Sequence, residues 1–178
     1  MNKKNIFIII GSAGKHSANE KLMNHFSELT KDDFNVTIFN DLKTLSPFDP
    51  QLSIDNPPRE IIDFRKAIKN SDGIIICTPE YIFSIPSGLK NALEWCVATT
   101  VFSDKPAGLI TASAHGQKGH EELQLIMKTV MAKFNDATTL LIPGIKGKIS
   151  DNGEIKDNGT KEYLQKFIYA FKELINGN

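Results

Sequence analysis

Continuous apolar runs, separated by amphipathic stretches, constrain the fold of this chain more than any other feature. The runs Ile6–Ile10 and Gly73–Cys77 contain no charged side chain. Runs of this kind are typical of strands that are covered on both faces, as in the interior of a parallel sheet. Phe34–Asn40 instead alternates apolar and polar residues, which predicts a strand nearer the sheet edge. The pattern therefore favours a parallel sheet with helices on both faces.

Two further apolar runs, Ala107–Ala112 and Thr138–Ile142, bring the predicted strands to five. Stretches with apolar residues at helical spacing alternate with these strands, as in a doubly wound α/β fold. The whole chain, 1–178, is expected to form a single domain. Helices are predicted to begin after Asn19, to span Arg59–Asn70, to run from Leu89 to Val101, to span Glu121–Phe134 and to include Leu164–Ile175.

Composition and charge exclude several classes of protein. The 21 basic and 21 acidic residues give a formal net charge of zero, so nucleic acid is not an expected partner. Ile6–Ile10 is too short for a signal peptide or a membrane span. The two cysteines, Cys77 and Cys96, are interpreted as buried apolar residues of a cytoplasmic protein. No grouping of His, Cys and Asp has metal-ligand spacing, so no metal is expected.

The loop Gly11–Asn19 follows the first predicted strand and opens a helix. Backbone N–H groups at a helix N-terminus, together with the helix dipole, favour an anion there. Ser12, Ser17 and Asn19 add possible donors, and Lys15 adds positive charge. The loop contains neither GxGxxG nor GxxxxGK followed by Ser or Thr, so both of those nucleotide-binding motifs are absent. A simple N-cap role for Ser17 stays open.

The stretch Thr78–Trp95, TPEYIFSIPSGLKNALEW, lies where another buried strand ends and another helix begins. Its two prolines fix backbone angles, and its glycine allows close approach of the backbone. Ligands bind outside the carboxyl ends of strands in open α/β sheets. Glu80, Tyr81 and Ser84 would supply an acceptor, a ring and a hydroxyl at such a position.

Both stretches resemble signatures of the NADPH-dependent FMN reductase family. PEYIFSIPSGLKNALEW is similar to the family's PEYNxSxPGxLKNAxDW, and the first loop is similar to its phosphate loop, GSxRxxSxN. Two positions differ, because Gly14 replaces an arginine and Ile82 replaces an asparagine. Lys15 is expected to substitute for the missing charge. The resemblance implies a flavodoxin-like, doubly wound, five-stranded parallel sheet of order 2-1-3-4-5.

The resemblance also implies an activity. It predicts an FMN-dependent oxidoreductase that passes hydride from NADPH or NADH, through bound FMN, to a quinone, an azo compound, free flavin or a similar small-molecule acceptor. The alternative is a non-enzymatic flavin-binding module for electron transfer or redox response, although a neutral chain is unusual for an electron shuttle. The family also implies a homodimer or a tetramer. Asp41–Pro58 would then be an irregular rim or subunit contact, and Trp95 is interpreted as part of a second apolar face toward another subunit.

A third loop, Ser113–His120, is expected near the pyrimidine edge of the flavin. His115 is a candidate proton donor, although a solvated loop histidine is the more common role for such a residue. No catalytic side chain is required, because the flavin performs the hydride transfer. The candidate flavin-binding residues are Gly11, Ser12, Lys15, Ser17 and Asn19 for the phosphate, Pro79, Glu80, Tyr81, Ile82, Phe83 and Ser84 for the ring, and Ser113, His115 and Gly116 for its edge.

Overall fold

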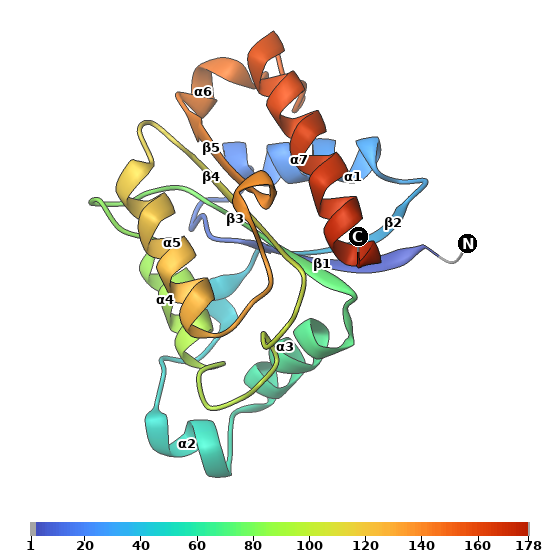
Figure 1. The fold of residues 1–178 in the computed structure, drawn as a ribbon. Helices are drawn as coiled ribbons and strands as arrows, with labels where there is room; N and C mark the ends of the chain where they lie inside the picture. The colour runs from blue at the N-terminus through green and yellow to red at the C-terminus, as the bar shows by residue number, and fades with distance from the viewer. Residues whose placement is uncertain (1–2, 178) are drawn as a thin grey trace.

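The computed structural model describes residues 3–177 and contains a five-stranded parallel sheet of order β2-β1-β3-β4-β5 (Figure 1). This arrangement confirms the predicted flavodoxin-like order, and it places the alternating strand β2 at an edge. The register aligns Ile8 of β1 with Ile38 of β2 and with Ile75 of β3. The strands are β1 (Lys4–Ile10), β2 (Phe34–Phe39), β3 (Gly73–Thr78), β4 (Ala107–Ser113) and β5 (Thr139–Pro143).

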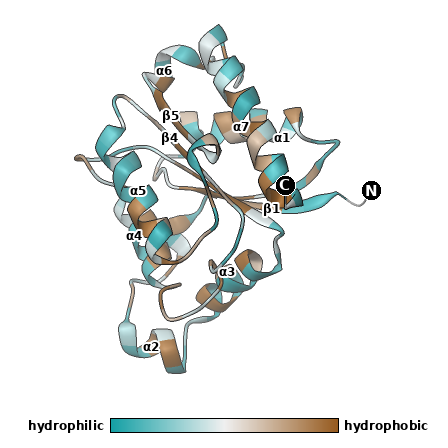
Figure 2. Ribbon diagram, in the orientation of Figure 1, coloured by the Kyte–Doolittle hydropathy of each residue, from teal (hydrophilic) through white to brown (hydrophobic). Residues whose placement is uncertain are grey.

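Helices cover both faces of the sheet, as the apolar runs predicted. The larger helices α1 (Ala18–Leu29) and α7 (Asn158–Asn176) pack on one face, and α3 (Arg59–Asn70), α4 (Ser87–Glu94) and α5 (Gln117–Thr129) pack on the other. In Figure 2 these helices carry hydrophobic and hydrophilic segments in alternation, as helices with one buried side do. No helix within residues 3–177 is long and apolar enough to cross a membrane. Four short elements complete the fold: η1 (Leu42–Thr44), α2 (Pro50–Asp55), η2 (Asp136–Thr138) and α6 (Ile145–Lys148).

Helix α4 ends at Glu94, several residues before the predicted end at Val101. The carbonyl oxygen of Trp95 accepts a hydrogen bond from Arg65 Nε at 2.8 Å instead of continuing the helical ladder. The N–H groups that follow bond to carbonyl oxygens only three residues earlier. The Cys96 N–H, for example, donates to Leu93 O at 3.0 Å. The apolar stripe therefore extends past the helix into tight turns.

Helix α5 begins earlier and ends earlier than the periodicity predicted. It starts at Gln117, directly after Gly116, whose φ of 93° sharply redirects the chain. It ends at Thr129, and Met131 then takes a left-handed φ of 60° that no continuing helix adopts. Part of the predicted third loop is therefore the first turn of a helix.

The stretch 41–58 contains η1 and α2 and folds over Trp95, so the prediction of a wholly irregular segment was wrong. The Trp95 indole N–H donates to Ser46 O at 2.7 Å, and its ring meets Phe48 edge-on with 5.4 Å between centroids. Trp95 is 0% exposed. The expectation that Trp95 forms a face toward another subunit is therefore wrong, because a segment of its own chain covers it.

Candidate functional site

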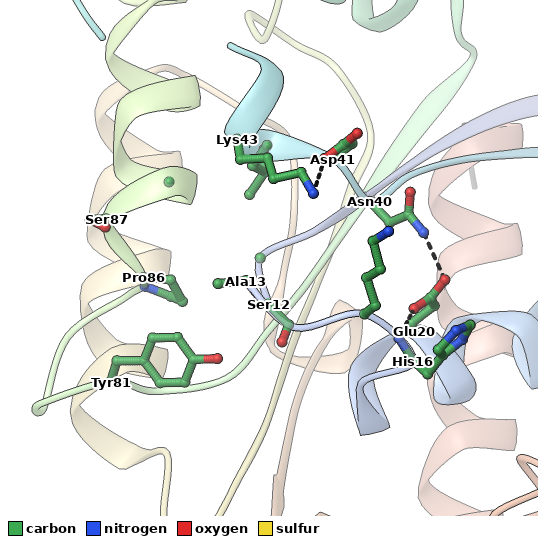
Figure 3. Close-up of a pocket in the computed structure, with 14 residues that line it drawn as sticks. Ser12, Ala13, His16, Glu20, Asn40, Asp41, Lys43, Tyr81, Pro86 and Ser87 are labelled. Carbon is green, nitrogen blue, oxygen red and sulfur yellow. Dashed lines mark hydrogen bonds and ion pairs between the residues drawn. The ribbon is translucent and has the colours of Figure 1, made fainter. Parts of the chain in front are cut away.

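A cavity of about 390 Å³ opens at the carboxyl edge of the sheet, between the loops that follow β1, β2 and β3 (Figure 3). Because β1 lies between β2 and β3, the chain leaves β1 and β3 in opposite directions, which creates the switch point where such sheets bind ligands. The lining residues are Gly11, Ser12, Ala13, Lys15, His16 and Glu20 after β1, Asn40, Asp41, Leu42 and Lys43 after β2, and Tyr81, Pro86, Ser87 and Gly88 after β3.

Gly11 brings the end of β1 directly against β3. Its N–H donates to Cys77 O at 2.8 Å, and a Cβ at this position would lie 2.2 Å from the Thr78 hydroxyl oxygen. No side chain fits there without displacing a strand. A few residues later His16 has a left-handed φ of 54°, which turns the chain into α1. These two residues therefore fix the path of the loop along the cavity.

Ser17 and Asn19 support this loop from outside the cavity. The Ser17 hydroxyl accepts the Glu20 N–H at 3.1 Å, which confirms the N-cap interpretation. Asn19 is buried, and its amide donates to Ala112 O at 3.1 Å and accepts a hydrogen bond from the Cys77 thiol at 3.3 Å. Its amide thus braces the loop against β3 and β4, and neither residue lines the cavity.

Glu20 lines the cavity and was missed by the sequence analysis. One carboxylate oxygen accepts the His16 N–H at 2.7 Å, and the other accepts from the Asn40 amide at 2.7 Å (Figure 3). An acidic residue in the first turn of a helix commonly stabilises that helix, so the residue type alone does not indicate a cavity residue. Its place directly after the predicted anion loop was the available signal.

The segment Tyr81–Ser84 forms a tight turn beside the cavity. The Tyr81 N–H donates to Ser84 O at 2.9 Å, and the Ser84 N–H returns a bond to Tyr81 O at 3.1 Å. The central residues Ile82 and Phe83 have φ of 50° and 59°, as a type I′ turn requires. This conformation is unfavourable for a β-branched residue. The two side chains are 94% and 76% exposed, so the turn presents a strained apolar tip.

Two carboxylates fasten this turn to helix α5. Glu122 accepts hydrogen bonds from the Ser84 hydroxyl at 2.6 Å and from the Ile85 N–H at 3.2 Å. Glu80 accepts from the Gly119 N–H, in the first turn of α5, at 2.8 Å. Both Glu80 and Ser84 are therefore used within the protein, and they fix the turn relative to the loop after β4.

The loop after β4 lies beside this assembly. Ser113 Oγ accepts the Glu80 N–H at 3.1 Å, and a Cβ on Gly116, whose φ is 93°, would lie 2.9 Å from a Leu141 methyl, so that side chain would have to shift. His115 is exposed and does not line the cavity. His120 is buried, and this burial lowers the pKa of its imidazole below the ordinary value.

The cavity suits a phosphate-bearing aromatic ligand. The Ser12 hydroxyl and the Lys15 ammonium are suitable partners for an anion. Tyr81 and Pro86 supply apolar surface on the opposite side.

Among residues 3–177, no cluster of three or more His, Cys, Asp and Glu residues could hold a metal ion. Of the predicted flavin-binding residues, Gly11, Ser12, Lys15 and Tyr81 line the cavity, whereas Ser17, Asn19, Pro79, Glu80, Ile82, Phe83, Ser84, Ser113, His115 and Gly116 do not.

Comparisons with known proteins agree with this geometry. Residues 4–144 match the model of the family described as NADPH-dependent FMN reductase. A 2-hydroxy-1,4-benzoquinone reductase from Burkholderia sp is 30% identical over 92% of this chain and 91% of its own length. The quinone reductase of Escherichia coli K12 is 27% identical over 97% of this chain and 96% of its own. The structure of FerB, a flavoenzyme NAD(P)H:(acceptor) oxidoreductase from Paracoccus denitrificans, has a TM-score of 0.79 at 24% identity and covers 98% of both chains, which shows a shared fold.

Proposed function

The chain belongs to the NADPH-dependent FMN reductase family, and on that premise we propose that it transfers electrons from reduced nicotinamide, through FMN bound at the cavity, to a quinone. It is an NAD(P)H-dependent oxidoreductase, and FMN and NAD(P)H are its cofactors. Full-length relatives named as quinone reductases support a quinone as the acceptor. Azo compounds and free flavin are the competing acceptors of the same class, flat conjugated molecules that accept two electrons.

The loop after β1 would hold the FMN phosphate. Ser12 and Lys15 lie on one side of the cavity, where a phosphate would gain hydrogen bonds and the attraction of the Lys15 charge. Gly11 contributes by close packing against Thr78, because the absence of a side chain lets the start of the loop lie directly against β3. Ser17 and Asn19 act indirectly, by holding that backbone in place.

The loop after β3 would border the flavin ring. Tyr81 contributes an aromatic wall, and the exposed side chains of Ile82 and Phe83 extend the apolar surface beyond it. Glu80 and Glu122 keep this surface rigid through their bonds to α5. The hydride chemistry itself is supplied by FMN. The exposed side of the ring site would receive the nicotinamide and the acceptor in turn, and His115 is an exposed imidazole on the neighbouring loop.

The observation that carries this proposal is the convergence of three loops on one cavity at the switch point. FMN titration should quench flavin fluorescence, and stopped-flow mixing with NADPH and with NADH should then bleach the bound flavin. Addition of 1,4-benzoquinone, an azo dye or excess FMN should identify the acceptor that restores flavin absorbance fastest. Absence of FMN binding by calorimetry would contradict the proposal. FMN that binds but is reduced by neither nicotinamide would favour the non-enzymatic module.

We also propose that the chain forms a homodimer or a tetramer. Trp95 no longer supports this assembly, since it is buried within its own chain. The assembly is instead supported by apolar side chains that remain exposed to solvent, since Val97, Leu125 and Met131 are 65%, 66% and 62% exposed. Light scattering at micromolar concentration should give a multiple of the 19.8 kDa chain mass, and the monomer mass alone would reject the assembly.

A cytoplasmic location is part of the same proposal. Cys77 and Cys96 are both unpaired and buried, as expected for a protein of a reducing compartment. Fractionation of cells that express the tagged chain should place it with the cytoplasmic markers.

A further inference from the structure

We propose that Glu20 places a negative charge in the phosphate loop and thereby weakens the binding of phosphorylated flavins. This inference rests on the proposed function, since it takes the loop after β1 as the phosphate-binding element. It concerns how tightly this particular chain holds FMN, and it depends on the contacts of the Glu20 carboxylate within the loop.

Both carboxylate oxygens of Glu20 are in use. One accepts the His16 N–H and the other accepts from the Asn40 amide, both at 2.7 Å. The His16 N–H belongs to the turn that enters α1, which is the kind of donor that an incoming phosphate would use. Glu20 thus supplies to its own loop a negative charge like that of the ligand.

The charges around the cavity strengthen this reading. Apart from His16, the charged side chains that line it are Lys15 and Lys43, which are basic, and Glu20 and Asp41, which are acidic. Lys43 already lies 3.5 Å from the Asp41 carboxylate. The four charges cancel, so a phosphate dianion meets no net positive charge. Replacement of Glu20 by a neutral residue would leave a net charge of one positive unit.

Two consequences follow for the binding of flavin. Glu20 satisfies the His16 N–H and links it to the end of β2 through Asn40, so it helps to hold the shape of the loop. With FMN, the phosphate would either face this carboxylate at short range or displace it from His16. Both arrangements cost free energy at the phosphate and none at the ring. The chain should therefore bind FMN more weakly than it would with a neutral side chain at position 20, whereas its affinity for riboflavin should not depend on that charge.

The test is Glu20→Gln, titrated with FMN and with riboflavin by fluorescence quenching. Glutamine keeps the size of the side chain and can still accept the His16 N–H, but it removes the charge. FMN should bind the variant about tenfold more tightly, which corresponds to about 1.4 kcal/mol, while riboflavin affinity stays unchanged. Glu28→Gln is the matched control, because Glu28 lies exposed on the same helix outside this cavity, and it should change neither affinity.

Each other outcome has a defined meaning. FMN affinity that is unchanged or weaker in Glu20→Gln overturns the inference, and so does equal tightening for both flavins, which indicates a structural effect. Glu20→Ala serves as the second variant if melting curves show that Glu20→Gln is unfolded, and the same FMN-selective gain is expected from it. A parent protein that binds no flavin would reject the proposed function itself, which is a different result from a parent that binds FMN with no gain in the variants.

Discussion

The loop after β1 and the loop after β3 border the same cavity and use their backbone and side chains in opposite ways. In the first loop the side chains of Ser17 and Asn19 work inside the protein, whereas within residues 3–177 the Ala13 and Lys15 N–H groups have no hydrogen-bond partner. In the second loop the backbone is paired within the turn, and the side chains of Ile82 and Phe83 face outward.

This difference explains how one cavity can bind both the phosphate and the ring system of a ligand. A phosphate needs donors and positive charge, which free N–H groups and Lys15 can supply. A ring system needs apolar surface, which exposed side chains can supply only if the backbone beneath them is already satisfied. Changes in the first loop should therefore affect FMN more than riboflavin, and changes in the second should affect both flavins alike.

The largest effect is expected from Gly11→Ala. The added methyl group would lie 2.2 Å from the Thr78 hydroxyl oxygen, so the loop must move away from β3. Overpacking of this kind should cost about 3 kcal/mol of folding free energy and weaken FMN by at least about a hundredfold. Thermal unfolding and FMN titration measure the two effects. Gly14→Ala is the control, because nothing lies within 4 Å of its Cβ position, and wild-type behaviour is expected. Equal losses in both variants would contradict the close-approach role of Gly11.

Lys15→Ala should separate the two flavins most clearly. A hydrogen bond to a charged group contributes about 1.5–3 kcal/mol, so FMN should bind roughly ten- to a hundredfold more weakly. Riboflavin, which has no phosphate, should bind as before. Fluorescence titrations of both flavins provide the measurement. Equal losses for the two flavins would place Lys15 near the ring, and no loss for either would make it a solvated lysine.

Glu122→Ala tests the opposite loop. It removes the acceptor for the Ser84 hydroxyl and the Ile85 N–H, so the turn becomes less rigid. FMN and riboflavin should both bind about tenfold more weakly, because the ring site is common to them. Glu121→Ala is the neighbouring control, since Glu121 is exposed and pairs with Lys118 on the helix surface, where an ion pair contributes little. A loss confined to FMN would contradict the assignment of the loop after β3 to the flavin ring.

Ile82→Gly should produce the smallest effect, and unlike most substitutions it should increase the free energy of unfolding. Glycine adopts a φ of 50° without the strain of a β-branched residue, and Ile82 is 94% exposed, so no packing is lost. The flavin-free protein should become more stable by about 0.5–1 kcal/mol in urea unfolding. Ile54→Gly is the contrasting control, because Ile54 is exposed within helix α2 and its replacement should destabilise by about 1 kcal/mol. Destabilisation by both variants would contradict strain in the turn.

Local patterns in the sequence were sufficient for the sheet and the cavity loops. Continuous apolar runs such as Ile6–Ile10 indicate strands that are buried on both faces, and the alternation of Phe34–Asn40 indicates an edge strand, so the five strands followed from the local sequence pattern. The family signatures then implied strand order, which the structure confirms. Gly11 was identified through the phosphate-loop signature, and the structure adds the physical reason for a glycine, since a Cβ there would meet the Thr78 side chain.

The tertiary structure decided which polar groups meet, because hydrogen bonds join residues that are far apart in the chain. Asn19 reaches Ala112, 93 residues away, and becomes a brace, although its position in the signature suggested a phosphate donor. Trp95 reaches Ser46, 49 residues away, and becomes core, although helical spacing placed it outside the stripe. Glu20 meets Asn40 only because β1 and β2 are neighbours. Periodicity records the environment of one segment, whereas these contacts depend on where a second segment is placed by the sheet.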